Sequence, residues 1–376
     1  MFKAVTRVLS RVFSCLRNED IEATKEREAR KMSEKMVKRV IKNAEWHANN
    51  MKKERKNWND TDEKEIENAV QNARKDIDED YKHRQCIVSG KFAEFHKYSH
   101  KKEATKLLCR IQYSQNEGRK LDMPLWNKVN GHPNVQPLIQ VYWTTETTSF
   151  LMPYYPENIA NEIDEMFYKK KKDGFEKVKK WLREVLSAME YLESKGLCHL
   201  KLMSRYIFIA KDGRAVVGGL SRLNFANKPM NSWDHKLLSI YFPPEMSPLN
   251  SFDGKFFDRW AYGMLSCECL TYLALRGVVK SSKNWRKHVY PTMCYIMDEK
   301  NFTGFIRSAF PWGKKITDNE SKLALNFVQG FLREDPKKRI SPSDAMQHKF
   351  LGQDDEFGTG PDKMWTDHTF SFNLCD

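Results

Sequence analysis

The pattern of hydrophobic and polar positions changes twice along the chain. Residues 18–85 are highly charged and free of Gly and Pro, which is typical of exposed helices. Residues 86–152 hold short apolar runs bounded by polar residues, as strands do. From residue 158 to residue 350 helical periods dominate, most clearly in residues 175–197. We therefore expect an α+β fold in which a small β-rich lobe precedes a larger α-helical lobe, with an N-terminal helical extension.

The first residues form a pattern of their own. Residues 1–17 contain no acidic side chain; Phe2 and Leu9 recur at helical spacing, and Arg7 and Arg11 lie elsewhere on the helix. A basic amphipathic helix of this kind lies on an anionic membrane, directs a chain to an organelle, or docks on its own protein. The sequence leaves these three interpretations open.

Composition narrows the class of protein. The net charge of +14 suits a nucleic acid, an anionic membrane or an acidic protein as partner, but it also suits a plain lysine-rich surface. The basic run at 168–180 carries no nucleic-acid fold signature, so we expect no nucleic-acid partner. None of the 8 cysteines forms a C-x-x-C pair, which argues against a zinc or disulfide framework and favours an intracellular, cytoplasmic setting. No apolar run approaches the ~20 residues of a spanning helix.

Three motifs in the second half of the chain carry a family resemblance. They read "YFPPEM", "FDRWAYGML" and "DPKKRISPSDAMQHKFL", in this order. Together they resemble the A-P-E, D-x-W-x-x-G and D-P-x-x-R motifs of eukaryotic protein kinases. The resemblance implies a bilobal protein-kinase-like domain over residues 86–352, followed by a tail over residues 353–376. It also implies an ion pair between Glu245 and Arg339, and an Asp258 carboxylate that accepts backbone hydrogen bonds from the catalytic loop.

The resemblance places the catalytic loop at "CHLKLMSRY". His199 keeps the histidine of H-R-D, and Leu200 replaces its arginine. Lys201 stands at the position of the catalytic aspartate, Tyr206 at the Mg²⁺-binding asparagine and Gly219 at the D-F-G aspartate. A lysine ammonium does not accept the substrate proton as a carboxylate does, and Mg²⁺ prefers carboxylate and amide oxygens. We therefore expect neither a metal site nor a catalytic residue at these positions.

The nucleotide cleft is expected to be degenerate as well. One glycine and the tip aromatic of a glycine-rich loop persist in "VSGKFAEF". An arginine replaces the strand lysine in "LLCRI", a leucine there would crowd the adenine, and the partner glutamate is absent. The residues that we assign to this cleft are Gly90, Phe92, Leu108, Arg110, the gatekeeper Met152, and Tyr155. Metal-independent ATP binding, with Arg110 and Lys201 facing the phosphates, stays open as an alternative.

These substitutions together predict a pseudokinase: a catalytically inactive signalling regulator or scaffold that needs no cofactor and acts through protein partners, such as an active kinase or a signalling adaptor. Two alternatives remain, an atypical Ser/Thr protein kinase and a membrane-tethered adaptor that uses residues 1–17. The stretch "LKLMSRYIFIA" resembles the catalytic loop of Tribbles-type pseudokinases. That group's strand lysine, loop aspartate and tail motif are absent here, so the subgroup is left open.

Overall fold

The structure is a computed structural model. It describes residues 80–89, 93–103, 107–113, 122–143, 148–169, 171–220, 223–226, 229–230, 241–245, 252–272, 293–311 and 313–352. The chain divides into two units, Met1–Asp62 and Glu63–Asp376, and every described residue belongs to the second. The expected helix at residues 1–17, the extension up to residue 79 and the tail at residues 353–376 lie outside the described residues.

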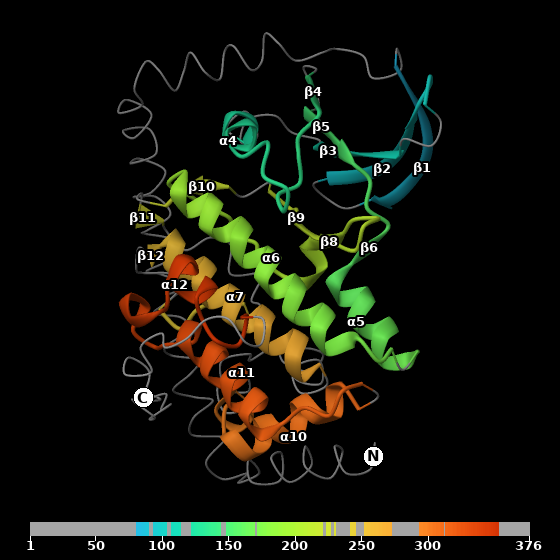
Figure 1. The fold of residues 1–376 in the computed structure, drawn as a ribbon. Coiled ribbons are helices and arrows are strands. Elements are labelled where there is room, and N and C mark those ends of the chain that lie inside the picture. The colour runs from blue at the N-terminus through green and yellow to red at the C-terminus, as the bar shows by residue number, and fades with distance from the viewer. Residues whose placement is uncertain are drawn as a thin grey trace, which may run out of the picture. The chain divides into compact units, whose positions relative to one another are not determined.

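Five antiparallel strands form one sheet (Figure 1). Their order is β1 (Tyr81–Ser89), β2 (Ala93–His100), β3 (Leu107–Tyr113), β5 (Thr148–Pro153) and β4 (Gln140–Trp143). Strand β1 begins inside the range where we expected helix up to residue 85, so that expectation is corrected there. All the side chains from Lys82 to Ile87 are exposed. A segment without buried side chains has no alternating apolar pattern, and pairing with β2 determines its conformation.

The two faces of this sheet pack differently. Phe150 and Met152 belong to the main core, where the Trp126 ring of helix α4 (Asp122–Lys128) stacks on Phe150 at 5.4 Å between ring centroids. Leu108 and Leu151 belong instead to a separate small cluster with Tyr98 and Tyr142. Neighbouring residues of a strand point to opposite faces, so Leu151 and Met152 cannot line the same side of the sheet.

The remaining helices form the larger lobe (Figure 1). They are α5 (Ile159–Tyr168), α6 (Gly174–Ser194), α7 (Gly254–Thr271), α10 (Glu299–Ala309), α11 (Asp318–Phe331) and α12 (Pro342–Met346). Helix α6 confirms the helix expected over residues 175–197, and its predicted apolar face, from Val178 to Leu192, is buried. Thr317 and Glu320 form a reciprocal capping box at the start of α11, which satisfies two backbone donors there.

Helix α7 is the centre of this lobe, because most of its residues are buried. The lack of a side chain at Gly263 lets the end of α11 pack closely on α7, since a Cβ at Gly263 would lie 2.7 Å from the Leu332 side chain. The Tyr262 hydroxyl donates to the carbonyl oxygen of Leu182 in α6 at 2.8 Å. Helix α7 therefore gives a rigid support for any segment that bonds to its first turns.

Pairs of short strands connect the loops between α6 and α7. Strand β7 (Leu197–Cys198) pairs with β10 (Asn224–Phe225), and β11 (Pro229–Met230) pairs with β12 (Phe252–Asp253). Strands β6 (Glu157–Asn158), β8 (Ile207–Ile209) and β9 (Ala215–Val217) form a three-stranded sheet. The side chain of Asn134 donates to the carbonyl oxygen of Ala215 at 2.8 Å, which ties the segment after α4 to β9. This network fixes the hairpin that follows the expected catalytic loop.

Candidate functional site

One carboxylate holds the loop that follows β7. Asp258, in the first turns of α7, accepts the backbone N–H of His199 and, at 2.8 Å, that of Leu200. Burial raises the pKa of the Asp258 carboxyl to about 7, and the two backbone donors oppose that rise. Leu200 has a positive φ of 60°, which a non-glycine residue adopts only where its surroundings impose it. The bonds to Asp258 supply that constraint.

His199 is buried and neutral. Its Nε2 lies 2.8 Å from the carbonyl oxygen of Gly218, and its Nδ1 accepts the backbone N–H of Lys201 at 3.1 Å. The carbonyl can only accept, so Nε2 carries the proton. Burial lowers the pKa of His199 to about 4. This imidazole therefore connects the loop to the hairpin and takes no part in proton transfer near neutral pH.

The three positions expected to carry the base and the metal ligands pack on one another. The Lys201 Nζ lies 4.2 Å from the centre of the Tyr206 ring, a cation–π contact. Gly219 has a φ of +72°, and a Cβ on it would lie 2.9 Å from Cγ of the Tyr206 ring. The Tyr206 ring therefore needs a glycine at 219, and it occupies the space into which a side chain at that position would extend.

An aromatic stack follows on the hairpin. Tyr155 and Phe208 stack with their ring centroids 5.7 Å apart and their planes 13° from parallel. Gly218 accommodates the Phe208 ring, because a Cβ there would lie 2.3 Å from Cε2. Burial raises the pKa of Tyr155. The side chain of the expected hinge residue Tyr155 thus packs on β8, directly after the loop.

The strands do not bring the expected cleft residues together. Met152 lies in the main core, whereas Leu108 lies in the cluster on the other face of the sheet, so they cannot border one adenine site. Arg110 stands in register with Leu151, a member of that other cluster. The expectation that Leu108 crowds a cleft gated by Met152 is therefore wrong, because side chains alternate along β3 and β5. Gly90 and Phe92 lie outside the described residues.

The frame of the loop extends to the far end of the chain. The Arg339 guanidinium donates to both carboxylate oxygens of Glu245, each at 2.6 Å, and to the carbonyl oxygens of Arg333 and Phe256 at 2.9 Å. The Arg339 side chain is fully buried, and that of Glu245 is 23% exposed. The ion pair that the family resemblance implied is thus present, in the strong bidentate form.

The sequence did not predict one hydrogen-bonded cluster beneath the loop, formed by Ser204, Tyr241 and Glu268. The Tyr241 hydroxyl donates to a carboxylate oxygen of Glu268 in α7, and the Ser204 hydroxyl donates to the other at 3.1 Å. Ser204 belongs to the loop itself, within the short turn Ser204–Tyr206. Glu268 follows Asp258 by ten residues on α7, and Tyr241 precedes "PPE". The available signal was Glu268, an acid within the otherwise uncharged second half of α7.

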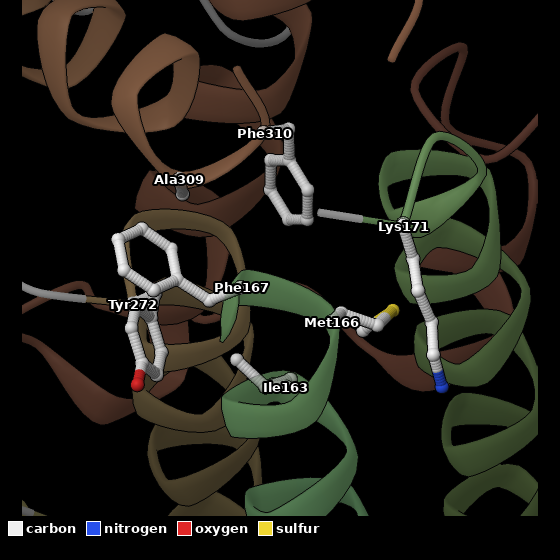
Figure 2. A pocket seen from close by; sticks show the side chains of 8 residues that line it. Ile163, Met166, Phe167, Lys171, Tyr272, Ala309 and Phe310 are labelled. Carbon is white, nitrogen blue, oxygen red and sulfur yellow. The ribbon is translucent and has the colours of Figure 1, made fainter. Parts of the chain in front are cut away.

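A hollow lies elsewhere in the larger lobe, between α5, α7 and α10 (Figure 2). It encloses about 310 Å³ including its open mouth, and its lining residues are Ile163, Met166, Phe167, Lys171, Gly174, Tyr272, Ala309 and Phe310. Lys171 is bound to Glu165 at 2.8 Å, and the Tyr272 hydroxyl donates to Asp164. Its polar groups are thus engaged with acids, and the lining resembles an apolar packing defect more than a reaction site.

Comparison with known proteins now identifies the fold. A family model described as the protein kinase domain matches residues 81–351, which include all of β1 and end just after α12. The chain belongs to the protein kinase family. The kinase domain therefore begins at Tyr81, five residues before the boundary that the sequence pattern predicted.

Curated kinases share part of this chain. Mouse calcium/calmodulin-dependent protein kinase type 1B is 27% identical over 179 residues, 46% of this chain and 46% of that protein. The serine/threonine-protein kinase kin-29 of Caenorhabditis elegans is 22% identical over 226 residues, 60% of this chain and 24% of that protein. The chain thus spans about half or less of the length of these relatives, both of which are named as kinases.

A solved kinase structure supports the bilobal α+β fold. A chain of the CAK complex from Chaetomium thermophilum, bound to ATP-gamma-S, matches with a TM-score of 0.58 and 14% identity, covering 74% of this chain and 93% of that chain. At this identity the likeness establishes the fold alone. In the part of the kinase domain that the structure describes, no helix is long and apolar enough to cross a membrane.

Proposed function

We propose that this protein is a pseudokinase, a kinase-family domain that transfers no phosphoryl group and regulates signalling through protein contacts. The observation that carries the proposal is the packing of both Lys201 and Gly219 against the Tyr206 side chain. Phosphoryl transfer in this family depends on a carboxylate near the nucleophile and on oxygen ligands for Mg²⁺. Lys201, Tyr206 and Gly219, which pack on one another, supply neither the carboxylate nor the metal ligands.

The side chains at these positions do not fit Mg²⁺. That ion takes hard oxygen ligands in near-octahedral geometry. Gly219 has no side chain to offer, and the Lys201 ammonium repels a divalent cation. Both residues pack against the aromatic ring of Tyr206. We therefore derive no catalytic step through this metal.

The intact frame supports a role that depends on shape. Asp258 and His199 still fix the loop, and the Glu245–Arg339 pair still anchors the segment that leads to "PPE". Such a frame keeps a kinase-like surface in place without the chemistry. We infer that the surface binds a protein, either an active kinase or a signalling adaptor, and that the cleft needs no nucleotide.

The competing function is an atypical Ser/Thr protein kinase, which the names of the relatives favour. It requires another group to act as base and another way to neutralise the triphosphate. Asp212 is a nearby acid, but it bonds to Arg214 in the hairpin turn, at 3.0 Å to the backbone N–H and 3.2 Å to Nε. Metal-independent ATP binding would require Lys201 to leave the Tyr206 ring.

The test is a pair of measurements on the full chain. Thermal unfolding is followed in a titration with ATP, with and without Mg²⁺, and transfer of labelled phosphate to a general protein substrate is measured. An active calcium/calmodulin-dependent kinase is the positive control. We expect no shift of the unfolding temperature and no transfer. Transfer that is lost in Lys201→Ala would overturn the proposal, and an ATP-dependent shift lost in that variant would establish nucleotide binding instead.

A further inference from the structure

A pair of histidines lies across the first two strands of the sheet. His83 of β1 and His96 of β2 approach with His83 Nε2 3.2 Å from His96 Nδ1. The other ring nitrogen of His96 lies 3.1 Å from Oε2 of Glu94, and the other oxygen of Glu94 accepts the Ser89 hydroxyl at 3.0 Å. The His83 side chain is exposed. The group is thus open to solvent and separate from the kinase loop.

The hydrogen bonds around His96 show which of its ring nitrogens carries the proton. Both oxygens of the Glu94 carboxyl lie at hydrogen-bond distance from a neighbour, and a glutamate carboxylate near neutral pH can only accept. Nε2 of His96 must then carry a proton, which leaves the Nδ1 lone pair directed at His83. A carboxylate that fixes an imidazole tautomer in this way is the arrangement that supports histidine ligands of metal ions.

The distance between the two facing nitrogens suits a tetrahedral ion. Zinc–imidazole bonds are about 2.0–2.1 Å long, and two such bonds whose ends lie 3.2 Å apart enclose roughly 100–106°, close to the tetrahedral angle. Mg²⁺ and Ca²⁺ prefer oxygen ligands, so a pair of imidazoles selects a transition-metal ion. An ion between the rings would replace the single hydrogen bond that now joins them, once the His83 proton moves to its Nδ1.

We propose that His83 Nε2 and His96 Nδ1 bind one zinc ion, with Glu94 as a positioning residue and water in the remaining positions. Water is needed because the described part of the chain holds no group of three or more His, Cys, Asp and Glu side chains placed to share a metal ion. The ion would join the edge strand β1 to its neighbour β2. Binding therefore stabilises β1, which is exposed over most of its length.

Isothermal calorimetry and thermal unfolding of the full chain, titrated with zinc chloride, test this site. His83→Gln and His96→Gln each remove one ligand, and Glu94→Gln removes the positioning carboxylate. We expect zinc to raise the unfolding temperature of the wild type. We also expect each ligand variant to weaken zinc binding at least about tenfold, and Glu94→Gln to weaken it by about tenfold. Mg²⁺ at the same concentrations should cause no shift.

Two variants serve as controls. His100 is on β2, and its Nδ1 accepts backbone N–H groups of Lys102 and Glu103 at 3.2 Å, so His100→Gln should bind zinc as the wild type does. Cys86 stands opposite His96 in the strand register and is exposed, so Cys86→Ser tests whether a thiol binds the ion. Zinc binding that survives in the His83→Gln/His96→Gln double variant, or that vanishes in Cys86→Ser alone, overturns the proposal.

Discussion

Two groups of residues meet at the kinase loop, and they are held in different ways. The frame consists of Asp258, His199 and the Glu245–Arg339 pair. Its side chains are largely buried, and most of their hydrogen bonds are made with backbone groups. The filling consists of Lys201, Tyr206 and Gly219; it is half-buried, and its members contact one another. Because the frame bonds to backbone, it maintains the loop whatever side chains the loop carries. The chemistry of a kinase can therefore be lost while its shape persists.

The largest expected effect comes from breaking the frame at Glu245. Glu245→Ala leaves the fully buried Arg339 guanidinium without its carboxylate, and an uncompensated buried charge typically costs about 3–5 kcal/mol. The partial exposure of Glu245 favours the lower end of this range. The free energy of unfolding from urea titration measures the loss.

The matched control is an exposed ion pair. Glu299 pairs with Lys322 at 3.1 Å, and both side chains are about 60% exposed. Glu299→Ala should change the free energy of unfolding by less than about 1 kcal/mol. Equal losses in the two variants would mean that the frame adds nothing beyond a surface contact.

The filling is tested next, at the glycine under the Tyr206 ring. Gly219→Ala places a methyl group 2.9 Å from the ring in a backbone conformation that disfavours a Cβ. We expect a loss of about 2–4 kcal/mol, the sum of overpacking and the positive φ. Gly304→Ala is the control, because Gly304 is inside α10 and a methyl group added there would meet no atom within 4 Å, so this variant should stabilise by about 0.5–1 kcal/mol.

A second variant separates the two causes of that loss. Adding Tyr206→Ala to Gly219→Ala removes the overlap and leaves only the backbone cost, so the double variant should recover part of the stability. If Tyr206→Ala gives no recovery, the ring is not what excludes a side chain at 219. The glycine would then be explained by φ alone.

The third prediction concerns the pH dependence of stability and His348, which lies in the motif that also contains Arg339. Burial lowers the pKa of His348 to about 4 from its ordinary 6.5, so the native state holds it neutral. Between pH 6.5 and 4 the unfolded chain binds a proton that the native state does not, so stability is lost as the pH falls. At pH 4.5 this loss is about 2 kcal/mol relative to pH 7.

A single variant isolates this contribution. His348→Gln cannot be protonated, and its amide can replace one of the bonds that His348 makes with Asn326 and the Phe350 backbone at 3.0 and 3.1 Å. Its thermal stability should fall less steeply than that of the wild type between pH 6.5 and 4.5. His199, whose pKa is lowered in the same direction, is present in both proteins and cancels in the difference. Parallel profiles would contradict a neutral, buried His348.

The frame could be predicted from the sequence much better than the filling. The apolar face of residues 178–192 predicted α6, and the resemblance of the motifs around Glu245, Asp258 and Arg339 to those of protein kinases implied the bonds that these residues make. The contact between Lys201 and Tyr206 instead depends on the path of a loop that turns through a positive φ at Leu200. No local pattern predicts that angle, because the Asp258 carboxylate that imposes it comes from a distant helix.

The sheet shows a second limit of the sequence. The apolar runs predicted β3 and β5, but assigning Leu108 and Met152 to one cleft required the strand register, and the register places them on opposite faces. An error of one residue in register moves a side chain to the other side of the sheet. The start of β1 was missed for a different reason, since its exposed residues before Cys86, Lys82 to Gln85, are polar and carry no apolar pattern.

The smallest expected effect gives the sharpest test of the filling. Lys201→Met keeps the aliphatic stem and removes the charge, and Tyr206→Leu removes the ring. A double-mutant cycle with these variants should give a coupling energy of about 0.5–1 kcal/mol, measured by urea unfolding, since a cation–π contact at a partly exposed site has this strength. The same cycle with Lys211→Met should give none, because Lys211 is exposed at the hairpin tip. Zero coupling between 201 and 206 would mean that each position changed independently, and the comparison between frame and filling would then reduce to the steric contact at Gly219.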